Sequence, residues 1–149
     1  MELAEIFEMW EKDCVIKAEN LTQTSMDTAV MHCKYLRYLS RERLELHDFQ
    51  AEREVLKLEK YIVYDEGPSK ENKKKYEKWT GKLPAKGAAT SKKELDLYLE
   101  ADSDLIVKNK ELAIHREKVN VLDDIIEQIK KREFLMNIII KEKTYQRGG

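Results

Sequence analysis

Two interleaved series of residues, all apolar except His115, lie in the C-terminal third and constrain the fold more than any other feature of this chain. The first series is Leu105, Leu112, Val119 and Ile126, and the second is His115, Leu122, Ile129 and Met136. Members of each series lie seven residues apart, and the offset between the series places them at the a and d positions of a coiled coil. The pattern therefore predicts one long helix from the Asp102–Asp104 region to the end of the chain.

The N-terminal half also predicts helices. Leu3, Ile6, Phe7 and Trp10 recur at helical spacing and predict a short amphipathic helix over residues 2–13. From Leu21 to Tyr64 there is no glycine or proline, and apolar residues continue at spacings of three and four. One long helix is the first interpretation, and a break near Ser40, where serine would cap a second helix, is the alternative. Gly67 and Pro68 end this element.

Shorter elements lie between the two long helices. Residues 70–79 are expected to form at most a turn or two of helix, and the Ser91–Glu94 spacing matches a capping box that starts a short helix. With only 5 glycines and 2 prolines in 149 residues, the chain lacks the turns of a β-sandwich or barrel. The predicted fold class is all-α, with long helices and a lysine-rich loop.

An apolar tract near the C-terminus predicts self-association. Residues 134–140 are almost continuously apolar, and a surface helix is rarely apolar on most sides. Either this tract is buried within the monomer or it faces other subunits. We expect the C-terminal helices to assemble the chain into a ring-like homo-oligomer. The residues predicted to form the oligomerisation seam are Leu105, Leu112, Val119, Leu122, Ile126, Ile129 and Met136.

Positive charge is concentrated in one segment. Between Gly67 and Lys93 there are nine lysines and two glutamates, which gives +7, whereas the whole chain carries −1 and the remaining residues therefore sum to −8. The same segment holds both prolines and three of the five glycines. It is either a solvated linker or an arm that binds a polyanion, since lysines on a loop follow a phosphate backbone and release its counterions.

Two aromatic residues, Tyr76 and Trp79, lie among these lysines. They either stack on unpaired bases or hold the loop onto the helices. The nucleic-acid contacts predicted in this loop are Lys73, Lys74, Lys75, Lys78, Lys82, Tyr76 and Trp79.

Several classes of protein are disfavoured. The sequence contains no GxxxxGK[ST] phosphate loop, no HExxH motif and no Cys/His cluster, so we expect neither catalysis nor a metal or other cofactor. His115, at a heptad position, is interpreted as a polar residue that sets helix register. The two cysteines, Cys14 and Cys33, indicate reduced thiols in a cytoplasmic protein. No apolar run of about 18 residues predicts a membrane span, and the acidic N-terminus does not resemble a signal peptide.

The order and length of these segments resemble the UvsY family of recombination mediators from T4-like bacteriophages. The likeness is carried by Glu11–Asp13, Val30–Leu36, Ala51–Tyr64, Leu99–Asp104 and Ile129–Phe134. It implies a non-enzymatic protein that forms rings of six or seven subunits through its C-terminal region. It further implies binding to single-stranded DNA and loading of a UvsX-like phage recombinase onto strands covered by the phage single-strand binding protein.

The resemblance also implies a DNA-binding motif, Leu-Lys-any-Arg, late in the long second helix. The matching stretch here is Leu56–Lys60, in which Leu56 and Lys57 agree and Glu59 replaces the arginine. Arg53, Lys57 and Lys60 keep helical spacing and predict a basic stripe that contacts DNA.

The predicted organisation has three parts: an N-terminal helical region (1–66), a basic loop (67–93) and a C-terminal helical oligomerisation region (94–149). Repeating a weak lysine site around a ring multiplies its affinity for a strand. The alternative function is a helical scaffold that oligomerises and joins proteins without binding DNA. A membrane-surface role is disfavoured, because the C-terminal apolar tract lacks a strongly basic polar face.

Overall fold

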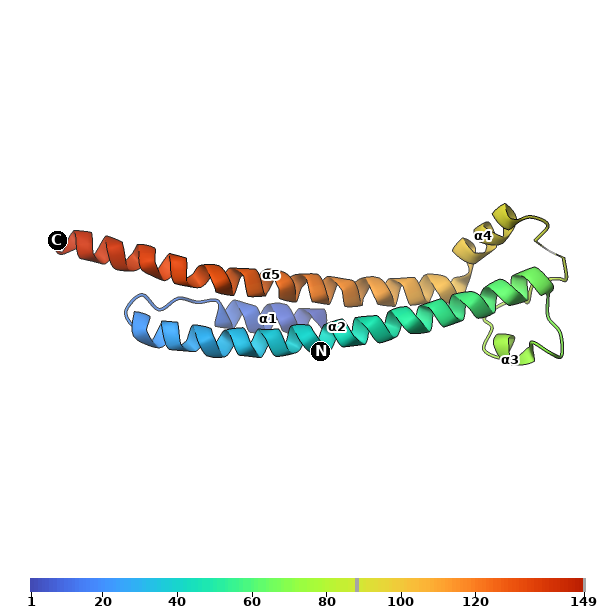
Figure 1. The fold of residues 1–149 in the computed structure, drawn as a ribbon, viewed down its shortest axis with the longest axis horizontal. Helices are drawn as coiled ribbons and strands as arrows, with labels where there is room; N and C mark the ends of the chain where they lie inside the picture. Colours follow the sequence, from blue (N-terminus) through green and yellow to red (C-terminus); the bar gives the residue numbers. More distant parts are fainter. Residues whose placement is uncertain (88, 149) are drawn as a thin grey trace. The chain divides into compact units, whose positions relative to one another are not determined.

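The computed structural model describes residues 1–87 and 89–148, and within them the chain is all-α, as predicted. Its helices are α1 (Leu3–Asp13), α2 (Leu21–Glu66), α3 (Lys73–Tyr76), α4 (Lys92–Ala101) and α5 (Ser103–Gln146) (Figure 1). The prediction of one long second helix is confirmed, because α2 continues through Ser40 without interruption, and the alternative break there is wrong. None of the helices in the described part of the chain is long and apolar enough to cross a membrane.

The ends of these helices follow the capping signals in the sequence. The Ser91 hydroxyl accepts a hydrogen bond from the Glu94 amide at 3.2 Å, so α4 begins where the capping-box spacing predicted. The Glu94 carboxylate reaches Thr90, one residue before the cap, and accepts from its amide at 2.8 Å. Asp102 caps α5 in the same way, accepting from the Leu105 amide at 2.9 Å. Asp102 is thus the single residue between α4 and α5, and its side chain caps the start of α5.

The chain forms two compact units, and each takes residues from both long helices. Unit 1 comprises Met1–Leu44 and His115–Gly149, and unit 2 comprises Glu45–Ile114. Inside each unit, α2 and α5 run antiparallel: in unit 1, Arg43 pairs with Asp123 at 2.7 Å, and in unit 2, Lys108 pairs with Glu52 at 2.8 Å. The three-part division by role remains a prediction.

Unit 1 is built where α1 packs against α2 (Figure 1). Ile6 and Tyr35 are fully buried, and the ring of Trp10 meets that of Tyr35 edge-on with centroids 5.6 Å apart. The Asp13 carboxylate accepts hydrogen bonds from Lys34 at 2.7 Å and from the Tyr35 hydroxyl at 2.9 Å. Burial of apolar surface and these charge-assisted bonds together fix the short helix on the long one.

The connection after α1 is held by one buried arginine on α5. Arg132 donates to the Thr28 hydroxyl at 2.9 Å, to the Cys14 carbonyl at 3.0 Å and to the Val15 carbonyl at 3.0 Å. A buried guanidinium needs such partners, because an unsatisfied charge inside a protein is costly. Arg132 therefore ties α5, α2 and the α1–α2 connection together.

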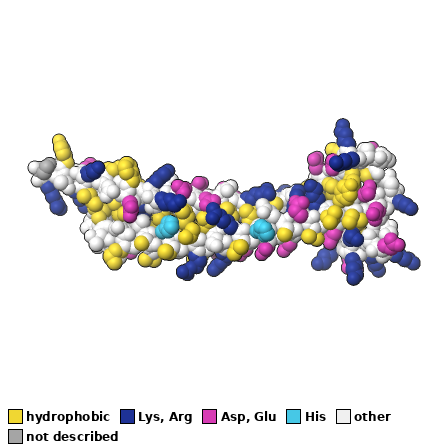
Figure 2. All heavy atoms as spheres, in the orientation of Figure 1, with side chains coloured by type: hydrophobic (Ala, Val, Ile, Leu, Met, Phe, Trp, Pro, Cys, Tyr) yellow, Lys and Arg dark blue, Asp and Glu magenta, His cyan; other side chains and the backbone are white. Residues whose placement is uncertain are grey.

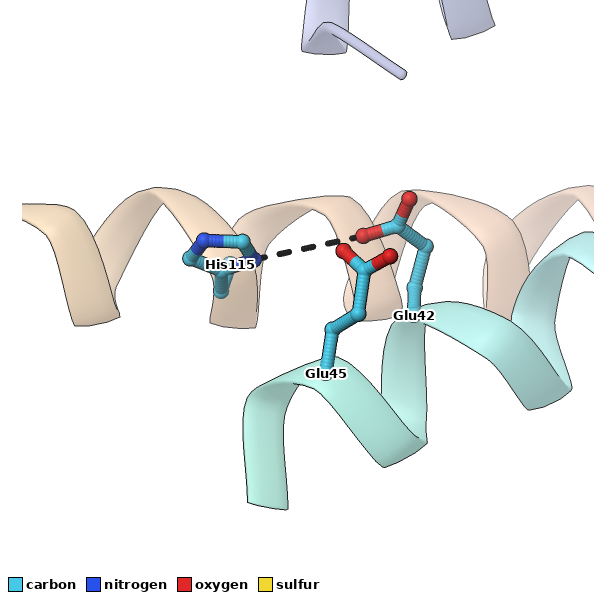
Figure 3. Close-up of side chains that lie close together, drawn as sticks. All are labelled: Glu42, Glu45 and His115. Carbon is cyan, nitrogen blue, oxygen red and sulfur yellow. Dashed lines mark ion pairs between the residues drawn. The ribbon is translucent and has the colours of Figure 1, made fainter. Parts of the chain in front are cut away.

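A second buried charge cluster lies beneath the N-terminus in unit 1. The Glu42 carboxylate is paired with Lys118 at 3.1 Å and lies 4.0 Å from His115 Nδ1 (Figure 3). Lys118 also donates to the Met1 carbonyl at 3.1 Å. Because sliding α5 along α2 would leave Glu42 buried without its lysine, the Glu42–Lys118 pair favours one register. The register role of His115 stays a prediction.

The heptad residues of α5 lie inside the chain itself. All seven residues of the predicted oligomerisation seam are buried: Leu105, Leu112, Val119, Leu122, Ile126, Ile129 and Met136. This burial corrects their assignment, because side chains covered within one chain offer no surface to another copy. The C-terminal tract differs: Phe134, Leu135, Ile138 and Ile140 are exposed, so the alternative that they are buried in the monomer is wrong for these four.

Replacing Leu122, which is fully buried, with alanine is expected to lower the free energy of unfolding by about 3 kcal/mol, because the substitution removes apolar contacts and leaves a cavity. Urea denaturation followed by circular dichroism measures this loss. The matched control is Leu97→Ala on the exposed face of α4, for which a change below about 0.5 kcal/mol is expected. Equal losses in the two variants would contradict the assignment of Leu122 to the core.

Candidate nucleic-acid interface

The lysine-rich segment of unit 2 begins at a glycine that no other residue can replace without strain. Gly67 follows α2 with φ +77°, a conformation that disfavours side chains, and a Cβ there would lie 2.9 Å from the Lys86 Cα. Residues 67 and 86 are therefore in close contact, and the chain between them forms a loop whose two ends meet.

Buried polar contacts fold the first part of this loop. Asn72 is almost fully buried. Its side-chain Nδ2 donates to the Gly67 carbonyl at 2.9 Å, and its side-chain Oδ1 accepts from the Ser69 backbone amide at 2.8 Å. The Tyr76 hydroxyl donates to the Ser69 carbonyl at 3.1 Å. A plain solvated linker would have no such buried side-chain bonds, and this segment is a structured loop.

Trp79 attaches the loop to α2. Its ring meets that of Tyr64 edge-on with centroids 5.1 Å apart, and the Lys60 ammonium lies 3.5 Å from the Trp79 ring centroid. On its other side Lys60 pairs with Asp102 at 3.2 Å and with Asp104. The structure thus favours the second role considered for Trp79, in which it holds the loop onto the helices.

Two ionisable groups near Trp79, the Asp104 carboxylate and the Tyr64 hydroxyl, have shifted pKa values. Burial opposes ionisation of Asp104, but hydrogen bonds from Lys60 and Thr80, with the Lys60 charge, bring the pKa of Asp104 below its ordinary value. Burial and the hydrogen bond that Tyr64 donates to Asp102 at 2.7 Å raise the pKa of the Tyr64 hydroxyl. Asp104 also accepts from the Thr80 amide at 3.1 Å, so it links the loop backbone directly to α5.

Most lysines of the loop face solvent. The exposed ones are Lys70, Lys73, Lys74, Lys78, Lys82 and Lys86, and Lys75 is half-buried. Within the described residues, none of these seven lies within 4.0 Å of a carboxylate oxygen. Figure 2 shows dark-blue side chains around this end of unit 2. Lys74, Lys75 and Lys78 line a hollow of about 400 Å³ beside Trp79, and the carboxylates of Glu59, Glu77 and Asp104 line it as well. The loop therefore presents lysines that form no ion pair in the described structure, and it holds them on a fixed frame.

The basic stripe predicted on α2 is interrupted. Lys57 is exposed and Arg53 is half-buried, and both line a hollow of about 320 Å³, where Arg53 donates to Asn109 at 3.0 Å. Lys60, by contrast, is 2% exposed and committed to Asp102 and Asp104. This burial corrects its assignment as a DNA contact, because its ammonium is covered by Trp79.

Comparison with known proteins identifies the family. A family model described as "Recombination, repair and ssDNA binding protein UvsY" matches residues 9–149. The chain belongs to the UvsY family. No curated protein sequence gives a significant match.

The fold agrees with solved UvsY structures. The crystal structure of the bacteriophage T4 recombination mediator protein UvsY in lattice type II has a TM-score of 0.81 at 19% identity, covering 99% of this chain and 98% of that one. Lattice type IV of the same protein gives 0.77 at 17% identity, covering 98% and 99%. Lattice type I gives 0.76 at 18% identity, covering 95% and 98%. The UvsY architecture therefore persists at low sequence identity.

In this member of the UvsY family, the sequence did not predict several residues that shape the candidate interface. Lys70 and Lys86 are exposed like Lys73 and Lys74, and their place in the same basic segment is the only sequence signal for them. Asn72, Asp102 and Asp104 position the loop. No local signal marked Asn72 or the pairing of the two aspartates with Lys60, because these contacts depend on how the loop folds back.

Acidification is expected to loosen the loop of this UvsY-family chain at Trp79. Because the folded pKa of Asp104 is depressed below 3.8, its stabilising effect is present above that pH and is lost as the pH falls through the folded value. Trp79 emission in a Trp10→Phe background, followed as the pH is lowered below about 4, should shift to the red. Asp104→Asn should remove that pH-dependent step, and an unchanged step in Asp104→Asn would contradict the role of Asp104.

Proposed function

We propose that this chain is a non-enzymatic recombination mediator that binds single-stranded DNA through its structured lysine loop. The observation that carries the proposal is the loop itself: its lysines lack acidic partners in the described structure, and the chain belongs to a family of recombination, repair and single-stranded DNA-binding proteins. Phosphates of a strand would replace small counterions at these lysines, so the affinity is independent of sequence and falls with salt. The expected site of action is the host-cell cytoplasm.

Lys73, Lys74, Lys75, Lys78 and Lys82 supply the proposed phosphate contacts, and Lys57 with Arg53 extends them along α2. Tyr76 is half-buried and donates its hydroxyl to the loop backbone. Tyr76 and Trp79 therefore act in this proposal by shaping the loop, and stacking on a base is a secondary contribution from whichever ring face remains accessible.

Self-assembly raises the affinity of this weak site. The exposed apolar side chains Phe134, Leu135 and Ile138 on α5 take over the oligomerisation role from the buried heptad residues. A ring of six or seven copies would repeat the loop around an axis, and a strand bound at one loop meets the next at high effective concentration.

In this proposal, the chain helps to load the recombinase by bending the strand that it binds. A strand bound to successive loops around a ring is bent, which disfavours the phage single-strand binding protein that covered it. A UvsX-like recombinase then nucleates on the presented segment. No bond is made or broken in this scheme, so neither a cofactor nor a catalytic residue is required.

The test measures recombinase nucleation on single-stranded DNA precovered with single-strand binding protein, using a fluorescent strand. Wild-type chain should shorten the lag before filament growth. A variant with Lys73, Lys74 and Lys78 changed to glutamine should leave the lag long. Filter binding to bare single-stranded DNA separates the rival function, because a scaffold that only joins proteins retains no strand on the filter.

A further inference from the structure

One apolar stripe of α2 in unit 1 points away from the chain's own core. Its apolar members Met26, Val30 and Cys33 follow heptad spacings of four and three, and Arg37 continues the stripe four residues later; all four are exposed, Val30 by 71%. The core-facing side of the same helix segment is lined instead by Thr24, Thr28, Met31, Tyr35 and Leu39. Both stripes have heptad spacing, and the one that contains Val30 is left uncovered by the rest of unit 1.

This stripe borders a hollow on the outer side of α2. The hollow measures about 650 Å³, and every residue lining it comes from α2: Ala29, Val30, Cys33, Lys34, Arg37, Tyr38 and Arg41. It is apolar at the Ala29–Cys33 end and basic at the Arg37–Arg41 end. Lys34 is committed to Asp13, whereas Arg37 and Arg41 have no carboxylate within 4.0 Å in the described structure. A ligand for this surface must therefore offer an apolar group beside negative charge.

The outer face of α1 has that composition. Phe7 is 47% exposed, and Ala4, Glu8 and Glu11 are exposed on the same side of the helix. Neither glutamate forms an ion pair with any described residue. The opposite side of α1 carries Ile6 and Trp10 and packs on the chain's own core. An aromatic side chain flanked by carboxylates complements a hollow that is apolar at one end and basic at the other.

We infer that the outer face of α1 in one copy docks on this α2 surface of a second copy. Phe7 fills the apolar end of the hollow, and Glu8 and Glu11 face Arg37 and Arg41. The inference rests on the self-assembly proposed above and names a contact for it. Because the two surfaces are different, the interface is heterologous, and repeated copies close into a ring when the rotation between neighbours permits.

The surfaces are well suited to discriminate correct from incorrect neighbours. Exposed ion pairs contribute little by themselves, but like charges placed in contact across an interface are strongly unfavourable. Reversing the charge on one surface should therefore disperse the assembly. Reversing both surfaces should restore it, because the two patches become complementary again.

The experiment compares molar mass by light scattering, without DNA, across matched variants. Arg37→Glu with Arg41→Glu should raise the concentration at which the oligomer forms at least tenfold, and Glu8→Arg with Glu11→Arg should do the same. The chain carrying all four substitutions should recover the wild-type mass. Lys110→Glu with Arg116→Glu reverses two exposed charges elsewhere on α5 and should leave the mass unchanged. Circular dichroism checks that every variant remains helical.

The outcomes distinguish this contact from the proposed function. A wild-type oligomer that is indifferent to Arg37→Glu with Arg41→Glu overturns the α1–α2 contact alone. Dispersal by each pair without recovery in the fourfold variant also overturns it, because the two patches then do not meet. A wild-type chain that stays monomeric overturns both this contact and the proposed ring. A wild-type chain that forms the oligomer but does not bind single-stranded DNA in the filter assay overturns only the DNA-binding proposal.

Discussion

Replacing Lys60 with alanine is expected to lower the free energy of unfolding by about 4 kcal/mol, since breaking a buried ion pair leaves its partners uncompensated. Lys60 is 2% exposed, and its ammonium is enclosed by Asp102, Asp104 and the Trp79 ring. Its removal leaves two carboxylates without their cation and uncovers one face of the indole. Guanidinium denaturation measures the loss, and Trp79 emission should shift to the red before the helices unfold.

The matched control is Lys57→Ala, one turn earlier on the same helix. Lys57 is exposed and forms no ion pair with a described residue, so its removal should change the stability by less than about 0.5 kcal/mol. It should instead weaken strand binding modestly. If Lys60→Ala were as stable as Lys57→Ala and lost only DNA affinity, Lys60 would be a strand contact and not a buried anchor of the loop.

Neutralising three loop lysines should produce the largest change in DNA binding. With Lys73, Lys74 and Lys78 changed to glutamine, the affinity for single-stranded DNA should fall by at least tenfold near physiological salt. The slope of log affinity against log salt concentration should become shallower by about 2 for each engaged subunit, because each phosphate contact on a single strand contributes about 0.7. Fluorescence anisotropy across a salt series measures both quantities.

The control for that variant changes three exposed lysines outside the loop. Lys110, Lys131 and Lys141 are exposed on α5, and their replacement by glutamine removes the same net charge from the chain. We expect the affinity to fall by less than threefold and the salt slope to stay close to that of the wild type. Equal losses in the two triple variants would mean that net charge, and not the loop, governs strand binding.

The helix boundaries were predictable because their signals are local. The Ser91 hydroxyl and the Asp102 carboxylate cap the first turns of α4 and α5, and these interactions involve residues only three apart. The absence of glycine and proline between Leu21 and Tyr64 likewise predicted the continuous α2. Propensity and capping are properties of neighbouring residues, so the sequence carries them directly.

The face that each helix buries was much harder to predict. The α5 heptads indicated a helical partner but not whether that partner was the chain's own α2 or another copy. On α2, apolar spacing alone did not show that the chain buries the stripe with Thr28 and Tyr35 and leaves the neighbouring seam with Val30 and Cys33 exposed. The buried position of Tyr35 allows its hydroxyl to donate to Asp13 on α1, a contact between residues that lie 22 positions apart in the sequence.

The same limit applied to the candidate interface. Composition located the lysine loop and its excess of charge, since these are sums over residues. Helical spacing also placed Lys60 beside Lys57, but spacing alone did not reveal that Trp79 returns to cover it. Which lysines face solvent, and which one anchors the loop, depends on how the loop folds back so that Trp79 lies over Lys60.

The close approach of Gly67 to Lys86 has a consequence for how such a protein changes over time. Since the two ends of the loop meet, the contacts that hold the loop in place lie at that junction, at Asn72 and Trp79, and at Thr80, which donates to Asp104. Substitutions at the exposed positions between them leave helix packing untouched. Natural variation can therefore change the affinity for a strand, one lysine at a time, without any compensating change in how the helices pack.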